Sequence, residues 1–404
     1  MPASARSLPA VRPSVRKLSR DLVALRRDLH RHPELSWQEK RTQEVILDRL
    51  RAWGLEDVRP IADTGATALV RGACPGRTVL WRADIDALPI QERNEAEYAS
   101  TVPGVMHACG HDGHVAIALG LARLLHEARG GLAGNVRFVF QPAEEMVGGA
   151  RRCVEEGILE EPRVEAVLGL HVAADVPTGA IVLGPGPAFA APTAISITIR
   201  GRGGHAAMPH QTVDAVVVAA QAVTTLQTVV SRSTSPADTV VLTIGSIHGG
   251  ERPNIIAEEV RMTGSIRTFD DKVLERTLQR VEEVIAGVAA SMGAEYDFSH
   301  YTACPVVVNA AAVTALVEGE ARAFFGEKRV LRRPPSTGAD DMAVFLEKVP
   351  GCYFFLGGRP QEQARRFPHH HPGFDFDERA LTLGLEFGLR LVEGYLRVVV
   401  GTEL

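Results

Sequence analysis

The chain has 404 residues, of which 45% are hydrophobic and 23% are charged, and its mean hydropathy is +0.01. This length predicts two or three domains, and the composition is that of a globular chain with an ample core. The formal net charge of −5 disfavours nucleic acid as the main partner. No run of about 18 apolar residues predicts a membrane span.

Neither the cysteines nor the amino terminus predicts export from the cytoplasm. The five cysteines are odd in number and widely spaced, and no signal peptide precedes them, so we expect reduced thiols in a cytoplasmic protein. Residues 1–17 are basic and free of acid, but their three prolines disrupt the amphipathic pattern of a transit peptide. We expect a flexible extension there.

From residue 18 onward, the apolar pattern predicts a layered α/β domain. Leu22, Leu25 and Leu29 recur at helical spacing, and a second helical pattern ends at Gly54. Further apolar runs predict strands at Thr78–Asp84, Val136–Gln141, Ala166–His171 and Tyr353–Leu356, and helices at Val115–Leu125 and Gly149–Glu156. Strands that alternate with helices are typical of α/β layers.

The middle of the chain has a different order of elements. The pattern predicts strands at Ala194–Ile199, Thr239–Ile247, Val260–Arg267 and Glu295–Tyr301, and helices at Val213–Val230 and Val273–Met292. This β-α-β-β-α-β order is ferredoxin-like. Because the Gly- and Pro-rich stretch Gly184–Pro192 precedes it and Pro305 follows it, we expect an inserted domain. We assign residues 190–303 to a lid or dimerisation domain, and residues 18–189 and 304–404 to a discontinuous catalytic domain.

Two short stretches contain six of the fourteen histidines, one around Cys109 and the other at His369–His371. Cys109 and His111 stand two residues apart in a glycine-containing turn, and a thiolate and an imidazole at this spacing can bind one Zn²⁺ or a similar ion. His111 and His114 share one face of the helix that they begin. Taken alone, this stretch supports equally a metal site and a buried cysteine beside histidines that cap a helix.

Carboxylates and one histidine follow the other predicted strands. Asp84 and Asp86 lie on one side of an extended chain, Glu144 and Glu145 are adjacent, and His171 ends an apolar strand. Each has a more ordinary explanation when taken alone: a polar turn, acids at a helix N-terminus, or a core histidine. All five lie at the carboxyl ends of predicted strands, where open α/β sheets hold their sites. Their shared placement favours a metal centre.

The order of these motifs resembles that of one known group of enzymes. The motifs are Leu29–Ser36, Arg82–Pro89, Met106–His114, Gln141–Glu145, Gly169–His171, Gly203–His205, Asn254 and His370–Pro372. Because it has these motifs in this order, the chain resembles the group of hippurate hydrolases, N-acyl-amino-acid amidohydrolases and indole-acetyl-amino-acid hydrolases. This group lies within the binuclear metal-dependent aminoacylase and exopeptidase superfamily. The resemblance covers almost all of the chain from Leu25 onward.

The resemblance implies two divalent metal ions per subunit, Zn²⁺ or Mn²⁺, with Co²⁺ and Ni²⁺ as further candidates. Its metal ligands fall on Cys109, His111, Glu145, His171 and His370. Cys109 takes the place of the Asp that bridges the two ions in related exopeptidases. His370 is chosen over His371 because the ligand of the family precedes the proline by two residues.

The resemblance also implies roles for residues around the metals. Glu144 matches the general base, and Asp86 matches the aspartate that orients a ligand. His205 and Asn254 match residues that reach the substrate from the lid, His205 from the partner in a homodimer or homotetramer. Arg267 is a candidate for binding the substrate carboxylate, although a solvent-facing arginine is an equally good interpretation. The implied reaction is hydrolysis of the amide bond of N-acyl-amino acids.

Two departures from the family pattern and several rival functions accompany this interpretation. The chain has Ile255–Ala257 where the family usually has Val-Ile-Pro, and Asp340-Asp341 where a Glu-Asp pair is common. The second departure shortens a side chain near the site. A dipeptidase or exopeptidase and an N-acetyl-diaminopimelate-type deacetylase are the alternatives among metalloenzymes. A binding protein that lost catalysis and an enzyme with Cys109 as nucleophile are the alternatives from other classes.

Overall fold

The structure is a computed structural model that describes residues 8–397. It divides into two compact units. The larger unit takes in the chain up to Ala188, Val307–Pro334 and the chain from Asp340 onward; the smaller unit is Phe189–Val306 with Pro335–Ala339. The sequence pattern does not assign this last segment to the smaller unit. The segment Pro335–Ala339 is held to the smaller unit by backbone hydrogen bonds. The N–H of Ala190 donates to the carbonyl oxygens of Ser336 and Gly338 at 3.1 and 3.0 Å.

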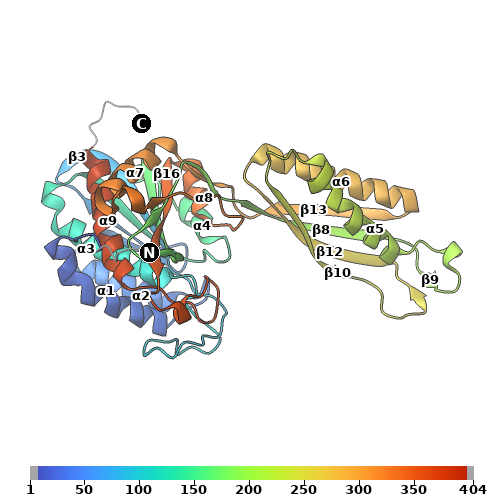
Figure 1. Ribbon diagram of the computed structural model, residues 1–404, viewed down its shortest axis with the longest axis horizontal. Helices are drawn as coiled ribbons and strands as arrows, with labels where there is room; N and C mark the ends of the chain where they lie inside the picture. The colour runs from blue at the N-terminus through green and yellow to red at the C-terminus, as the bar shows by residue number, and fades with distance from the viewer. Residues whose placement is uncertain (1–7, 398–404) are drawn as a thin grey trace, which may run out of the picture. The chain divides into compact units, whose positions relative to one another are not determined.

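The larger unit is built on an eight-stranded sheet with the strand order β1-β2-β4-β3-β5-β16-β6-β15. These strands are β1 (Glu56–Ile61), β2 (Gly65–Arg71), β3 (Cys74–Asp84), β4 (Ala133–Gln141), β5 (Ala166–Pro177), β6 (Ile181–Val182), β15 (Val330–Leu331) and β16 (Gly351–Arg359). Figure 1 labels β3 and β16 of this sheet. The central strands β4, β3, β5 and β16 run parallel, which confirms the expected α/β class. The antiparallel edge formed by β1 and β2 is not predicted by the sequence pattern.

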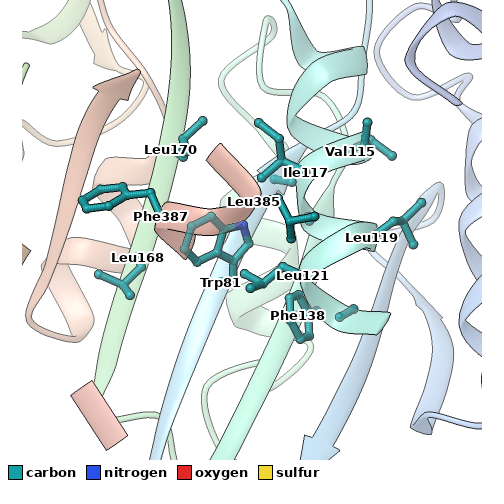
Figure 2. Packing of buried hydrophobic residues seen from close by; sticks show 14 of the residues in the cluster. Trp81, Val115, Ile117, Leu119, Leu121, Phe138, Leu168, Leu170, Leu385 and Phe387 are labelled. Carbon is teal, nitrogen blue, oxygen red and sulfur yellow. The ribbon is translucent and has the colours of Figure 1, made fainter. Parts of the chain in front are cut away.

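Helices cover both faces of this sheet. One face carries α1 (Pro13–Arg31), α2 (Lys40–Ala52), α3 (His111–Glu127), α7 (Ala311–Phe325) and α9 (Arg379–Arg397), which share one apolar core with the sheet. The other face carries α4 (Gly149–Glu155) and α8 (Met342–Lys348). In the core, Trp81 of β3 lies among Leu121, Phe138 and Leu385 (Figure 2). Gly388 makes room for this ring, because a Cβ there would lie 3.0 Å from it.

The amino-terminal segment differs from the flexible extension expected for residues 1–17. Helix α1 begins at Pro13. A proline in the first turn costs no hydrogen bond, because the N–H groups of that turn have no partner within the helix. Arg12 forms ion pairs with two glutamates of α9, the nearer at 2.7 Å. Residues 8–17 therefore belong to the larger unit, and residues 1–7 lie outside the described residues.

The smaller unit contains a four-stranded antiparallel sheet in the order β10-β12-β8-β13, with two helices on one face (Figure 1). Its main elements are β8 (Ala191–Arg200), α5 (Ala215–Thr228), β10 (Val240–His248), β12 (Glu259–Thr268), α6 (Asp271–Met292) and β13 (Glu295–Thr302). This is the expected ferredoxin-like order. A short pair, β9 (Gly204–His205) with β11 (Ile255–Ile256), completes the strands of the smaller unit. A second short pair, β7 (Gly186–Phe189) with β14 (Val307–Asn309), belongs almost entirely to the larger unit.

Apolar side chains at helical spacing hold α5 against the sheet of the smaller unit. By length and composition alone, α5 and its π-helical extension, Ala215–Ser233, are apolar enough to cross a membrane. Val218, Ala222 and Leu226 are nevertheless buried in the core formed with β8, β12 and α6. The carboxylate of Asp214 caps the first turn by accepting from the N–H of Val216 at 3.0 Å. The helix is thus the core helix of a globular unit.

Candidate metal centre

The parallel strands bring polar side chains together where β3 and β4 end. Asp84 pairs with Gln141 of β4, and Arg82 pairs with Gly169 of β5. Arg82 and Gln141 bond Asp341 at the start of α8, so these side chains lie on the face that carries α4 and α8. Asp84 bonds Arg82, and the ring of His171 lies 6.2 Å from that of Tyr353, whose hydroxyl bonds Asp340. Strand β5 continues to Pro177, so His171 lies inside its strand and not at the end that the apolar pattern predicts. His171 nevertheless lies beside the last residues of β3 and β4, because those two strands end at this point of the sheet.

His111 is the first residue of α3, and one of its ring nitrogens faces the cluster of candidate ligands around Cys109. Its Nδ1 donates to the carbonyl oxygen of Asp86 at 2.9 Å and lies 3.3 Å from the carboxylate of the same residue. Its Nε2 is buried and has no hydrogen-bond partner within residues 8–397. Carboxylate oxygens of Asp84, Glu144 and Glu145 lie 3.7 to 4.0 Å from this nitrogen. A buried nitrogen that faces three carboxylates fits a bound cation.

The loop after β4 holds two adjacent glutamates in a strained turn. Ala143 has a φ of +50°, which is uncommon for a residue other than glycine. The buried carboxylate of Glu39 stabilises the turn, because it accepts from the N–H of Ala143 at 2.8 Å and from the hydroxyl of Thr64 at 2.6 Å. Glu145 donates its N–H to the carboxylate of Asp86 at 3.0 Å. Its own Oε1 is buried and has no hydrogen bond in the described part of the chain.

The remaining candidates come from three other segments. His370 has a φ of +64°, and its N–H donates to the carbonyl oxygen of Ala108 at 2.8 Å, which brings it beside Cys109. Nε2 of His370 lies 3.3 Å from Oε1 of Glu145. On β5, Nδ1 of His171 donates to the carbonyl oxygen of the next residue at 2.7 Å. Its Nε2 is therefore left with a lone pair, 3.4 Å from the sulfur of Cys109.

These donor atoms form two groups that share Cys109. One atom each from Cys109, His111 and His171 lie within 4.8 Å of one another, and so do atoms from Cys109, Glu145 and His370. The structure thus brings together all five residues that the resemblance assigns as ligands. Sulfur, imidazole and carboxylate donors around one shared thiol fit two neighbouring divalent ions better than a single closed tetrahedral site.

The charges around the cluster favour a positive ion. Burial, and after it the nearby carboxylate of Asp340, raises the pKa of Glu144 well above its usual range. Burial opposes protonation of His111, but Asp84 and the bond with Asp86 outweigh it and raise the pKa of this imidazole to about 10. Carboxylates here thus outnumber the positive groups, and a cation relieves their repulsion.

The same surroundings disfavour Cys109 as a nucleophile. Burial, and after it the charge of Glu145, raises the pKa of the Cys109 thiol well above its usual range. An activated cysteine needs the opposite, a pKa lowered by a positive neighbour. Burial and then His114 lower the pKa of His171 well below its usual range, so this imidazole stays neutral. A neutral imidazole is the form that binds a metal ion.

Arg82 organises the acidic groups beneath the cluster. Its buried guanidinium donates to Asp84 at 2.5 Å, to Gln141 at 2.8 Å, and to Asp340 and Asp341 at 3.1 Å each. Asp340, which departs from the family pattern, and its neighbour Asp341 are therefore fixed to the sheet beside the site. The sequence reasoning assigned no role to Arg82, although an arginine inside an apolar strand is itself a sign of a buried ion-pair network.

Three other histidines nearby have their ring nitrogens or faces engaged. His114 bonds Asp84 through Nδ1, and its Nε2 accepts a backbone N–H of β5 at 2.8 Å. Nε2 of His369 accepts another N–H of the same strand at 3.2 Å. His371 stacks on Phe367 with ring centres 4.4 Å apart. This arrangement agrees with the choice of His370 over its neighbours.

In the smaller unit, the β9–β11 pair brings His205 and Asn254 together. The N–H of Ala206 donates to the carbonyl oxygen of Asn254 at 3.2 Å. The exposed ring of His205 accepts the N–H of Ala207 at Nδ1, 3.0 Å away, so its neutral form carries the proton on Nε2 and can donate outward. Arg267 lies half-buried on β12, on the face of the sheet opposite the helices.

Known proteins share this chain's pattern over most of its length. Residues 80–394 match the model of peptidase family M20/M25/M40. The chain belongs to this family. It is 38% identical over 372 residues to an N-acetylcysteine deacetylase of Bacillus subtilis, which covers 91% of this chain and 94% of that protein. It is 44% identical over 286 residues to an N-acyl-L-amino acid amidohydrolase of Geobacillus stearothermophilus, which covers 70% and 76%.

Solved structures of M20 proteins have the same architecture. One is a dinuclear metal binding peptidase of the M20 family from Bacillus subtilis, with a TM-score of 0.84 and 34% identity. The match covers 95% of this chain and 100% of that one. The M20 protein described here is therefore a metal-dependent amidohydrolase that acts on amides, with a layered α/β catalytic fold and a lid, as the sequence predicts. Its donor groups and this relative support two metal ions.

Proposed function

We propose that this M20 amidohydrolase cleaves the amide bond of hippurate-like, N-acetyl or other N-acyl-L-amino acids into a carboxylic acid and a free amino acid. The observation that carries the proposal is a pair of buried ligand atoms, Nε2 of His111 and Oε1 of Glu145, which have no hydrogen bond within residues 8–397 and lie beside the Glu144 carboxylate. Similarity to an N-acyl-L-amino acid amidohydrolase and an N-acetylcysteine deacetylase supports the substrate class.

We assign five residues as ligands of two divalent ions, with Cys109 shared. They are Cys109, His111, Glu145, His171 and His370. The thiolate suits Zn²⁺, and the carboxylate and imidazoles also suit Mn²⁺. When bound, such ions polarise the amide carbonyl and lower the pKa of a water molecule at the site.

Glu144 moves the proton in this mechanism. Its carboxylate lies 3.9 Å from Nε2 of His111, at the edge of the cluster, where it can reach a water molecule bound there. It takes a proton from the attacking water and returns it to the nitrogen of the departing amino acid. Asp86 positions the site, because it contacts both the ring of His111 and the backbone of Glu145.

We assign the lid residues to substrate binding. His205 donates from Nε2 to the developing oxyanion in the site of a partner subunit, which requires at least a homodimer. Asn254, held beside it by the β9–β11 pair, also contacts the substrate. Arg267 is the lid's candidate for binding the substrate carboxylate, as an alternative to a cation of the larger unit.

A substrate panel tests the proposed function. Purified protein is assayed with N-benzoyl- and N-acetyl-L-amino acids, with dipeptides, and with N-acetyl-diaminopimelate. We expect amino acid release from the N-acyl-amino acids, loss of that activity on chelation, and recovery with Mn²⁺, Zn²⁺ or Co²⁺. Hydrolysis of dipeptides alone would replace this proposal with an exopeptidase.

A further inference from the structure

Arg333 packs on an aromatic ring that neighbours the metal centre within the larger unit. Its guanidinium carbon is 4.3 Å from the ring centre of Phe355 on β16. Phe355 is the cross-strand neighbour of His171 in the parallel β5–β16 pair, and the two rings are 5.8 Å apart. A cation therefore stands one aromatic ring away from a proposed metal ligand.

The guanidinium of Arg333 has donors to spare. Its one ion pair among residues 8–397 joins NH1 to Oδ2 of Asp175 at 3.3 Å. The side chains are 35% and 65% exposed, so water competes for this pair and it contributes little to stability. Arg82, which lies directly beneath the cluster, is buried and already donates to four partners. Of these two arginines, Arg333 is the one that a ligand can engage.

The substrate class proposed above carries a carboxylate close to the bond that is cleaved. Only the amide nitrogen and the α-carbon separate this carboxylate from the scissile carbonyl. When the carbonyl sits at the cluster, a negative charge therefore lies near Glu144 and Glu145, and it needs a compensating cation. A planar guanidinium binds a carboxylate with two parallel hydrogen bonds, and stacking on an aromatic ring holds its plane.

We propose that Arg333 binds the α-carboxylate of the substrate in place of Asp175. Through this contact, Arg333 makes the enzyme prefer N-acyl-amino acids to amides that lack a carboxylate next to the cleaved bond. This inference rests on the proposed function. The competing interpretation is a solvent-exposed arginine that only packs on Phe355.

The test compares Arg333→Ala with a matched control, Arg332→Ala. Arg332 is the adjacent arginine, and it pairs with Glu318 on α7 at 2.6 Å. Each variant is assayed on N-acetyl-L-methionine, N-acetyl-L-cysteine and N-benzoylglycine, as the free acid and as the carboxamide. For Arg333→Ala we expect kcat/KM on the acids to fall about tenfold or more, mainly through KM. On the carboxamides it changes less than about twofold.

Two further variants sharpen the result. Arg333→Lys keeps the charge but not the two-pronged geometry, so its kcat/KM falls between those of wild type and Arg333→Ala. In a Glu144→Gln background, which preserves the uncleaved substrate, calorimetry measures binding directly. There Arg333→Ala should weaken binding of the acid about tenfold and leave the carboxamide unchanged.

The outcomes separate this inference from the proposed function. If Arg333→Ala impairs acids and carboxamides equally, or behaves as Arg332→Ala does, the inference is overturned while N-acyl-amino-acid hydrolysis stands. If only Arg267→Ala removes the preference for the acid, the carboxylate site belongs to the lid and Arg333 is excluded. If wild type cleaves no member of the panel, the proposed function fails, and the inference fails with it.

Discussion

The backbone N–H of Glu145 donates to the carboxylate of Asp86 at 3.0 Å, and the same carboxylate lies 3.3 Å from Nδ1 of His111. Asp86 thus connects one proposed ligand from each donor group. Burial opposes its ionisation, but the bond with His111 and those from Ser36 and Glu145 outweigh it and lower the pKa of Asp86. We expect Asp86→Asn to weaken metal binding about 10- to 100-fold. Metal titration checks this, and wild-type affinity in the variant would contradict it.

Sharing of Cys109 between the two groups predicts different metal stoichiometries for two ligand variants. Cys109 belongs to both donor groups and His370 to only one. We therefore expect Cys109→Ala to lose both ions and His370→Ala to retain about one of them. Elemental analysis after gel filtration measures the metal content. His371→Ala is the matched control, because that ring stacks on Phe367 and should leave the content unchanged.

The buried Arg26 predicts a large stability difference between adjacent arginines. Its guanidinium donates to Asp112 at 2.8 Å and to Asp375 at 2.9 Å, which connects α1 to the start of α3 and to the segment after His370. We expect Arg26→Met to destabilise the larger unit by about 3–5 kcal/mol, because two buried carboxylates lose their cation. Arg27→Met, in which a half-exposed pair with Glu378 is lost, should cost less than about 1 kcal/mol. Denaturant unfolding compares them, and equal losses would contradict the prediction.

Complementation tests whether His205 acts in the partner's site. The His205→Ala and Glu144→Gln homodimers should both be nearly inactive. A heterodimer purified through two tags should regain one working site, with Glu144 from one chain and His205 from the other. If His205 acts within its own chain, neither site is complete, and the heterodimer is as inactive as its parents.

Periodicity predicts the architecture, because apolar side chains must face a core at the period of their element. It predicts the parallel strands and both helices of the smaller unit. It misses β1 (Glu56–Ile61), because half of its residues are charged and the strand lies at an edge, where exposed residues are tolerated. It also ends β5 at His171, because the pairing that continues this strand comes from β16, far along the chain.

The site depends on geometry that local pattern does not contain. Taken alone, each candidate motif had an ordinary explanation, and only the resemblance selected a ligand set. The left-handed backbone at Ala143 and His370 carries no glycine to reveal it. Arg333 packs on the ring of Phe355, although no sequence motif links the two positions. Such contacts follow from the fold and therefore appear only in the structure.

The most direct test of the account compares metal content and turnover in Glu144→Gln and Glu145→Gln. The account assigns proton transfer to Glu144 and metal binding to Glu145. Glu144→Gln should therefore keep two ions per chain while kcat falls by roughly 10² to 10⁴. Glu145→Gln should lose metal. Reversed phenotypes, or two full equivalents of metal in Glu145→Gln, would contradict the assignment of base and ligand.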